Sequence, residues 1–217
     1  MDFGHINQSC SIFHTNKCAP VYIQNNILVT VSFNTINFHS DSKTTFSPIV
    51  SQSQITAIAT YPKEGLIAFS DSNTIHILQF PDLTPVGVAQ CHAENDLDIV
   101  ALAFSADGSF IASLGSLPTH TISIFDYRLS ASNAILRDNP IQDPLLCSIE
   151  NNGPASKIAF NPLDKRILFT CDPNMEYKDD EFDLDVDIGP SDGFCRGIRF
   201  FKISMLTSSF DMSQMYY

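Results

Sequence analysis

The chain has 217 residues, of which 44% are hydrophobic, and its formal net charge at pH 7 is −12. This length and hydrophobic content exclude a disordered tail and allow one all-β domain with a sizeable core. The acidic balance argues against nucleic acid and against an anionic membrane surface as partners, because both are bound by clustered Lys and Arg.

The first residues and the cysteines bear on the cellular compartment. Residues 1–10 contain neither the basic nor the apolar region of a secretory signal, and no apolar run approaches the roughly 18 residues that span a bilayer. The six cysteines form no Cys-x-x-Cys pair, which leaves a structural zinc site without support. We therefore expect reduced, mostly buried thiols in a cytoplasmic protein rather than three disulfides.

Short β-strand patterns fill most of the chain. Residues 1–20 lack periodicity, and we expect them to form a loosely ordered lead-in. From there on, Val, Ile, Phe and Thr alternate with small polar residues, and Gly, Pro, Asn and Asp separate the runs. No stretch predicts an amphipathic helix. The predicted strands are 26–31, 35–40, 55–61, 66–70, 74–79, 99–104, 110–114, 121–126, 157–160, 167–170 and 197–202.

These strands recur as units. The positions Ile58, Leu102 and Ile158 are equivalent, and a repeat of roughly 40–45 residues with several strands per unit is the sequence signature of propeller blades. A closed propeller usually has about 4–8 blades of four strands, so the fold class is all-β with about four blades in an incomplete propeller. The expected domain is 21–205, divided into 21–50 (partial), 51–90, 91–140 and 150–205, and followed by a tail at 206–217.

The unit at 91–140 resembles a WD repeat. WD repeats carry Gly-His near the start and Trp-Asp near the end; here His92 stands at the first place and Phe125-Asp126 at the second, with Asp107-Gly108 in a turn between them. The resemblance implies that His92 and Asp107 tie the blade together by hydrogen bonds and that the other three residues are structural. The remaining units are more degenerate, and the chain has no Trp.

A narrower resemblance links residues 20–205 to the large WD-repeat cilia- and flagella-associated proteins, especially the tether component beside inner-arm dynein motors. Its most specific stretch is 113–120, a Ser-x-Gly-Ser-x-Pro sequence before a strand. The resemblance implies an axonemal scaffold in the cytoskeleton of a cilium or flagellum, with dynein-arm and microtubule-associated proteins as partners. That group also carries a long coiled coil, which has no counterpart here. The alternative is a general cytoplasmic WD-repeat adaptor in complex assembly or trafficking.

An acidic insertion interrupts the last unit at 174–193. Asp183, Asp185 and Asp187 have calcium-loop spacing, but the glycine is displaced and the twelfth loop position is Phe194 instead of Glu, which disfavours calcium. An exposed, hydrated loop is the main expectation. A docking site for a basic partner, with Tyr177 and Phe182 as anchors, remains open. The acidic residues of this possible docking loop are Glu176, Asp179, Asp180, Glu181, Asp183, Asp185 and Asp187.

No pattern in the sequence indicates catalysis. The chain has no Gly-x-Ser-x-Gly elbow and no Gly-rich phosphate loop, and its six histidines lack metal-ligand spacing. Most of the 17 phenylalanines fall in alternating strands, where core packing is the expected role. We therefore expect a non-enzymatic scaffold that binds proteins, without catalytic residues, cofactor or metal.

Overall fold

The computed structural model describes residues 18–40, 46–91, 98–116, 118–129, 144–151, 155–171, 198–205 and 210–215. These residues form four antiparallel sheets of four strands each, which we call blades 1 to 4. The prediction of an all-β chain with about four blades is confirmed. Among the described residues, no helix has the length and apolar character that a bilayer crossing requires.

Within each blade the strands follow one another in chain order. Blade 1 holds β1 (Val21–Ile23), β2 (Ile27–Ser32), β3 (Thr35–His39) and β4 (Ile49–Val50), with the short 3-10 turn η2 (Gln24–Asn26) after β1. Blade 2 holds β5 (Ile55–Tyr61), β6 (Leu66–Asp71), β7 (Thr74–Gln79) and β8 (Thr84–Gln90). Blade 3 holds β9 (Ile99–Phe104), β10 (Ile111–Gly115), β11 (Ile122–Phe125) and β12 (Leu145–Ile149). Blade 4 holds β13 (Lys157–Phe160), β14 (Ile167–Cys171), β15 (Ile198–Met205) and β16 (Phe210–Met215).

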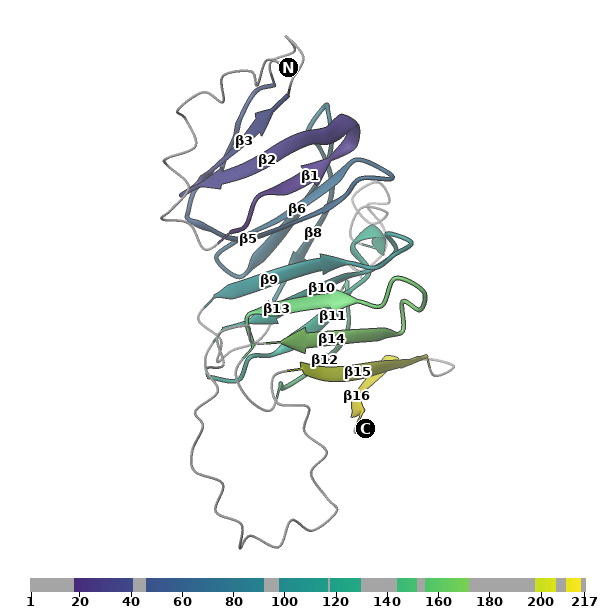
Figure 1. Cartoon of the computed structure of the whole chain (residues 1–217). Coiled ribbons are helices and arrows are strands. Elements are labelled where there is room, and N and C mark those ends of the chain that lie inside the picture. Colours follow the sequence, from purple (N-terminus) through teal and green to yellow (C-terminus); the bar gives the residue numbers. More distant parts are fainter. Residues whose placement is uncertain are drawn as a thin grey trace, which may run out of the picture.

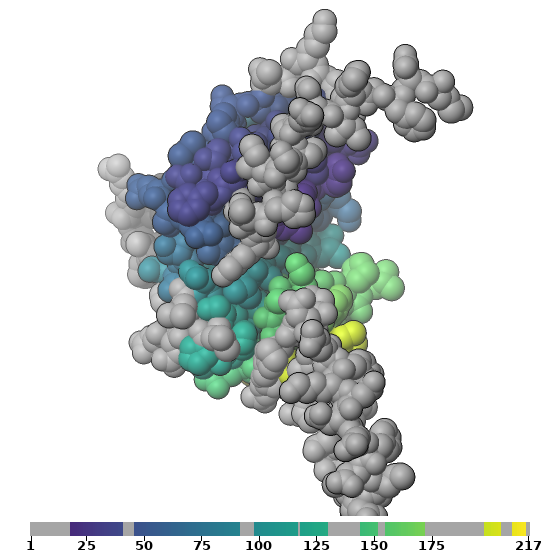
Figure 2. Space-filling model, turned by 60° about the vertical axis from the view of Figure 1, so that its left-hand side comes forward, coloured from purple at the N-terminus to yellow at the C-terminus, as the bar shows by residue number. Residues whose placement is uncertain are grey.

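The blades succeed one another in a row, with blade 1 at one end and blade 4 at the other (Figure 1). Their first strands face a common axis, because β1 contacts β5, β5 contacts β9 and β9 contacts β13. A narrow cavity of about 110 Å³ runs along these inner edges, and Cys18, Ala57, Leu102 and Lys157 are among its lining residues. The space-filling view shows the same succession from purple to green (Figure 2). This is the arrangement of propeller blades around an axis.

Three apolar clusters fill the spaces between consecutive blades. The cluster between blades 1 and 2 includes Val29, Ile36 and Ile67. The cluster between blades 3 and 4 includes Leu114 and Phe201. Each arises from period-2 alternation, which directs one set of side chains from a strand to the preceding blade and the other set to the next blade.

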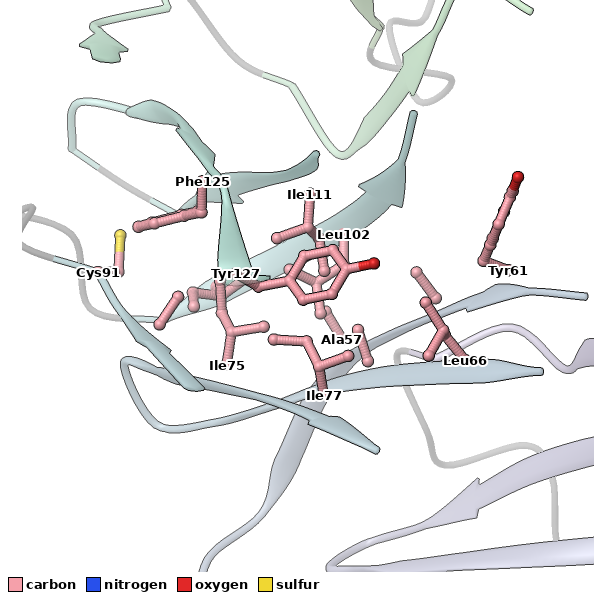
Figure 3. Packing of buried hydrophobic residues seen from close by; sticks show 14 residues of the cluster. Ala57, Tyr61, Leu66, Ile75, Ile77, Cys91, Leu102, Ile111, Phe125 and Tyr127 are labelled. Atoms are coloured by element: carbon pink, nitrogen blue, oxygen red, sulfur yellow. The ribbon is translucent and has the colours of Figure 1, made fainter. Parts of the chain in front are cut away.

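The cluster between blades 2 and 3 contains the largest buried aromatic side chains. Figure 3 shows Tyr127 in its middle, between Ile75 and Ile77 on one side and Leu102 and Ile111 on the other. Tyr127 and Ile111 have no exposed surface. Close packing of this kind fixes the position of neighbouring blades relative to each other.

The third strand of blade 4 also carries an apolar residue at the position that, in blades 1 to 3, points to the following blade. Ile198 occupies the place that Ile36, Ile75 and Ile122 occupy in the preceding blades, since each is the second residue of the third-strand pattern. Those three residues are fully buried, whereas Ile198 is 47% exposed. The alternation predicted from sequence therefore continues in blade 4, on a face where no described blade follows.

The strand count per blade differs from the prediction in the outer positions. Blade 1, expected to be partial, has four strands, and β16 lies in the stretch expected to be a tail at 206–217. The outermost strands β4, β8, β12 and β16 are partly exposed, and β8 contains Pro85 and Gly87. An edge strand tolerates both residues, because only one of its sides must complete the hydrogen-bond ladder.

Candidate protein-binding groove

An open groove lies where the first hairpin turns of blades 2, 3 and 4 meet. These turns join β5 to β6, β9 to β10 and β13 to β14, and they lie on the same side of the molecule (Figure 1). The groove has a volume of about 510 Å³. We call it the turn-face groove, and its lining residues are Tyr61, Lys63, Ala106, Asp107, Pro162, Leu163 and Lys165.

Asp107 organises the turn of blade 3. Its Oδ1 accepts hydrogen bonds from Ser105 Oγ at 2.8 Å, from Ser109 Oγ at 2.7 Å and from the Ser109 backbone N–H at 3.1 Å. Ser105 Oγ in turn accepts the Phe110 N–H at 3.0 Å. An Asp followed by Gly at a tight turn supplies this local bonding because its short side chain reaches the backbone two residues on.

Asp107 also ties blade 3 to blade 4. Lys165 Nζ donates to Asp107 Oδ2 at 2.7 Å and lies 4.9 Å from the centre of the Phe110 ring. Partial desolvation opposes ionisation of Asp107, but the bonds from Lys165, Ser109 and Ser105 outweigh it and hold the pKa of this carboxyl well below its ordinary value. Asp107 is therefore a fixed negative charge, neutralised by the lysine of the next blade.

Gly108 allows blade 2 to approach the same turn. Its φ is +66°, in the left-handed region, and a Cβ there would lie 2.4 Å from Cε1 of Tyr61. The Gly108 carbonyl accepts the Tyr127 hydroxyl at 2.6 Å and the Arg128 guanidinium at 3.3 Å. Only glycine meets both the backbone conformation and the close contact with the Tyr61 ring.

Two cations extend from blades 2 and 3 beside this turn. Lys63 Nζ donates to the Ala106 carbonyl at 3.3 Å and lies 6.0 Å from the centre of the Tyr61 ring. Arg128 pairs with Glu64 of blade 2 at 3.3 Å and lies over the Tyr127 ring. These contacts favour positions of both charges next to the turn of blade 3.

Leu163 gives the groove an exposed apolar wall. Its side chain is 94% exposed, although its backbone is fixed: Asn161 Oδ1 accepts the N–H groups of Leu163 at 2.8 Å and Asp164 at 3.3 Å. Arg166 pairs with Asp164 at 2.9 Å and lowers the pKa of that carboxyl to about 2. Leu163 thus adds an exposed apolar side chain on an ordered backbone to the charged groups of the groove.

The sequence-predicted blade residues fall in different places. Asp107 and Gly108 lie in the turn at the groove, whereas Phe125 has no exposed surface and packs in the cluster between blades 2 and 3. Asp126 Oδ1 accepts the Arg128 N–H at 3.2 Å, which orders the start of the segment after β11. His92 and the acidic insertion at 174–193, with its possible docking residues, lie outside the described residues.

Three groove residues were missed by sequence reasoning. Lys63, Leu163 and Lys165 belong to turns, and turn residues were treated only as connections between strands. Leu163 carried a usable signal, since an apolar side chain between Pro162 and Asp164 has no place in a strand or core. The two lysines carried none, because their meeting depends on how the blades stack.

A second open groove of about 620 Å³ lies between blades 1 and 2 and is lined by Ser51, Ser53, Asp71, Ser72 and His76, among others. Ser51 Oγ donates to Asp71, and Phe69 stacks on His76 with ring centres 5.1 Å apart. Its polar groups thus bond across the two blades. It contains Val50, which is 66% exposed, but no lysine, whereas the turn-face groove combines an exposed leucine with charged groups from three blades and is the better candidate.

Within the described part of the chain, no group of three or more His, Cys, Asp or Glu is placed to hold a metal ion. The four described cysteines, Cys18, Cys91, Cys147 and Cys171, are free thiols. Desolvation by burial raises the pKa of Cys18 and of Cys147 to about 11. Thiols with raised pKa values hold little thiolate at neutral pH and are poor nucleophiles.

Known proteins resemble this chain in structure but not in sequence. No model of a known protein family matches it, and no protein of curated function matches it. Hsv2 of Kluyveromyces lactis is similar in structure, with a TM-score of 0.62 and 15% identity over 90% of this chain and 59% of that one. Hsv2 of Kluyveromyces marxianus is also similar, with a TM-score of 0.61 and 16% identity over 88% of this chain and 57% of that one.

A chain in a structure of the mitotic checkpoint complex is also similar, with a TM-score of 0.50 and 19% identity over 66% of this chain and 43% of that one. This chain thus spans about half the length of the solved chains it matches. These solved chains are WD-repeat β-propellers, and four sheets of four strands around an inner axis agree with them. The chain therefore has the fold of a WD-repeat β-propeller, of which the described residues form four blades.

Proposed function

We propose that this chain is a protein-binding scaffold that presents the turn-face groove to a partner. The observation that supports it most is Leu163, 94% exposed beside fixed charged groups from three blades. An interface core of this kind combines an apolar anchor with a polar, ordered rim. The WD-repeat propeller fold and a similar chain in a multiprotein checkpoint complex agree with this proposal.

The chemistry of the groove favours binding over catalysis. Asp107, the carboxylate that lines it, already accepts four hydrogen bonds or ion-pair contacts. Its low pKa makes it a weak proton acceptor. No histidine, cysteine or serine is among the lining residues that could serve as a nucleophile or a base.

Affinity capture with matched variants tests this proposal. Leu163→Asp places a charge on the apolar wall, and Val88→Asp places one on the edge strand β8, where Val88 is 45% exposed. We expect proteins captured by the wild type and by Val88→Asp to be lost from Leu163→Asp. If all three chains capture the same proteins in the same amounts, the groove is not the binding surface.

The finer proposal is an axonemal scaffold that helps to position or tether inner dynein arms in a cilium or flagellum. It is supported by the resemblance of residues 20–205, and above all of 113–120, to the cilia- and flagella-associated WD-repeat group. Fractionation of ciliated cells tests it. The proposal expects the protein in detergent-extracted axonemes, together with inner-arm dyneins. Its recovery only from the detergent-soluble cytoplasm would favour a general WD-repeat adaptor.

A further inference from the structure

We propose that the turn-face groove binds an acidic peptide segment that carries an aliphatic side chain next to its carboxylates. This inference rests on the proposed scaffold function and names the chemistry of the partner. It depends on three features of the groove: one lysine, Lys63, whose charge no described carboxylate neutralises, the position of that charge beside the turn of blade 3, and the apolar side chains of Pro162 and Leu163.

The first feature is the charge of Lys63. Lys165 is neutralised by Asp107 at 2.7 Å, and Arg166 by Asp164 at 2.9 Å. Within the described residues, Lys63 Nζ instead contacts two neutral groups, the Ala106 carbonyl and the Tyr61 ring. The groove therefore carries an excess positive charge in a chain whose net charge is −12. A carboxylate would gain a charge-assisted hydrogen bond from the remaining donors of Lys63.

The second feature is the fixed position of this charge. Tyr61 donates its hydroxyl to the same Ala106 carbonyl at 3.3 Å, and the Tyr61 side chain is mostly buried. The aromatic ring and the carbonyl thus favour a position of the ammonium beside the turn of blade 3. A cation that is already ordered loses less side-chain entropy when a ligand binds.

The third feature is the apolar wall at Pro162 and Leu163. The hydrogen bonds to Asn161 order this turn, so Leu163 projects from an ordered backbone. An aliphatic ligand side chain that covered Leu163 would remove apolar surface of both partners from water. Because Lys63 and Leu163 come from blades 2 and 4, the ligand must span the turn of blade 3 between them, which suits an extended peptide.

Charge complementarity and the apolar wall together select this ligand class. A nucleic acid would also be attracted to Lys63, but its backbone offers no aliphatic side chain for Leu163 and is bound by clustered Lys and Arg, whereas the described groove holds one unpaired lysine. A basic peptide would meet the same Lys63 as a like charge. An acidic segment with an adjacent Leu, Ile or Val uses both features.

Fluorescence polarisation with the full chain tests the inference. The probe is a short fluorescein-labelled peptide in which Asp alternates with Leu, and the matched peptide has Asn in place of each Asp. We expect the Asp peptide to bind at least about fivefold more tightly than the Asn peptide at low salt, and the difference to shrink at high salt. Equal binding of both peptides, or no binding of the Asp peptide, would overturn the inference.

Variants assign the two features separately. Lys63→Gln is expected to weaken binding of the Asp peptide by about threefold and to leave the Asn peptide unchanged. Leu163→Ser is expected to weaken both peptides by about fivefold or more. Lys157→Gln, at the axial cavity, is the control and should change neither. An effect of Lys157→Gln as large as that of Lys63→Gln would show that only the overall charge matters and would contradict the inference.

The outcomes separate this inference from the proposed function. If Leu163→Asp abolishes protein capture while the Asp peptide fails to bind, the groove is a binding surface for a partner of other chemistry, and only the inference fails. If capture is unchanged as well, both fail. Circular dichroism of each variant confirms that Lys63 and Leu163, both exposed turn residues, are not needed for folding.

Discussion

The buried hydroxyl of Tyr127 donates a hydrogen bond to the carbonyl oxygen of Gly108 at 2.6 Å. Tyr127 follows β11 and Gly108 lies in the turn before β10, so this bond joins two segments at the same end of blade 3, where Ile111 pairs with Phe125. The Tyr127 ring fills the cluster between blades 2 and 3 and has no exposed surface (Figure 3). Core packing and the shape of the groove are therefore coupled through one side chain.

Tyr127→Phe tests the energetic value of this bond. The variant keeps the ring in the core and removes the donor to Gly108, while Arg128 still donates to the same carbonyl. We expect a loss of about 1 kcal/mol in the free energy of unfolding, measured by urea denaturation. Tyr61→Phe, whose hydroxyl bonds Ala106 at the longer distance of 3.3 Å, is the comparison and should lose less. The reverse order would contradict the account.

Gly108→Ala tests the close approach of blade 2 to the turn of blade 3. The added Cβ would lie 2.4 Å from Cε1 of the Tyr61 ring, which is packed and cannot move freely. We expect a loss of about 2–3 kcal/mol in the free energy of unfolding, from overpacking and the positive φ together. Gly65→Ala is the matched variant, since its φ is +69° but its Cβ would meet the Gln24 amide at 2.9 Å. That flexible side chain can shift, so its loss should be about 1 kcal/mol. Equal losses would show that the contact with Tyr61 does not matter.

Much of the fold was predictable because blades depend on local alternation. The inner strands show two recognisable patterns: β7 buries every other residue at its start, and β6, β10 and β11 are short apolar runs that are buried on both faces. The outer strands were not predicted, because β4 has only two residues and the apolar residues of β8 are interrupted by Pro85 and Gly87. Because an edge strand is partly exposed, packing restricts its residue types less than it restricts those of an inner strand.

The groove could be predicted only in part. The Asp107-Gly108 turn stands out because tight turns restrict residue type locally. The bond between Asp107 and Lys165 could not be predicted. The two residues are 58 positions apart, and they meet only because blade 4 stacks on blade 3. Contacts between blades are set by three-dimensional packing, which leaves no spacing in the sequence.

Asp107→Asn tests the charge at the centre of the turn. The pKa of Asp107 is lower in the folded state than the value of about 3.9 expected in the unfolded chain. The ionised carboxylate therefore contributes its full stabilisation above about pH 3.9, and this contribution is lost as the pH falls below that value. We expect the Asn variant to be less stable by about 1 kcal/mol at neutral pH, discounted because the ion pair is partly exposed.

The difference between wild type and Asp107→Asn should narrow as the pH is lowered below about 4, because the wild-type carboxyl then gains a proton more readily in the unfolded state. Urea midpoints measured over a pH series give this difference. Asp82→Asn, in an exposed turn of blade 2, is the control for a lost carboxylate. A difference for Asp107→Asn that stays constant down to the lowest pH would contradict the assigned role.

Phe125→Ala tests the residue that stands at the Trp position of a WD repeat. Phe125 has no exposed surface and lies in the cluster between blades 2 and 3, so the variant leaves a cavity. We expect a loss of about 3–5 kcal/mol in the free energy of unfolding, measured by thermal or urea denaturation. Tyr22→Ala removes an aromatic side chain that is 61% exposed and should change stability by less than about 1 kcal/mol. Similar losses for both would show that Phe125 is not part of the core.

Photo-crosslinking from position 163 tests the central claim, that the turn-face groove binds a protein partner. A photoreactive amino acid replaces Leu163 in one chain and Val88 in a control chain, and both are irradiated in cells that express the protein. We expect defined adducts from position 163 alone, and their loss when Lys63→Glu is added to the same chain. Adducts that Lys63→Glu leaves unchanged would contradict the acidic-ligand inference alone, and adducts of equal yield from both positions would contradict the central claim.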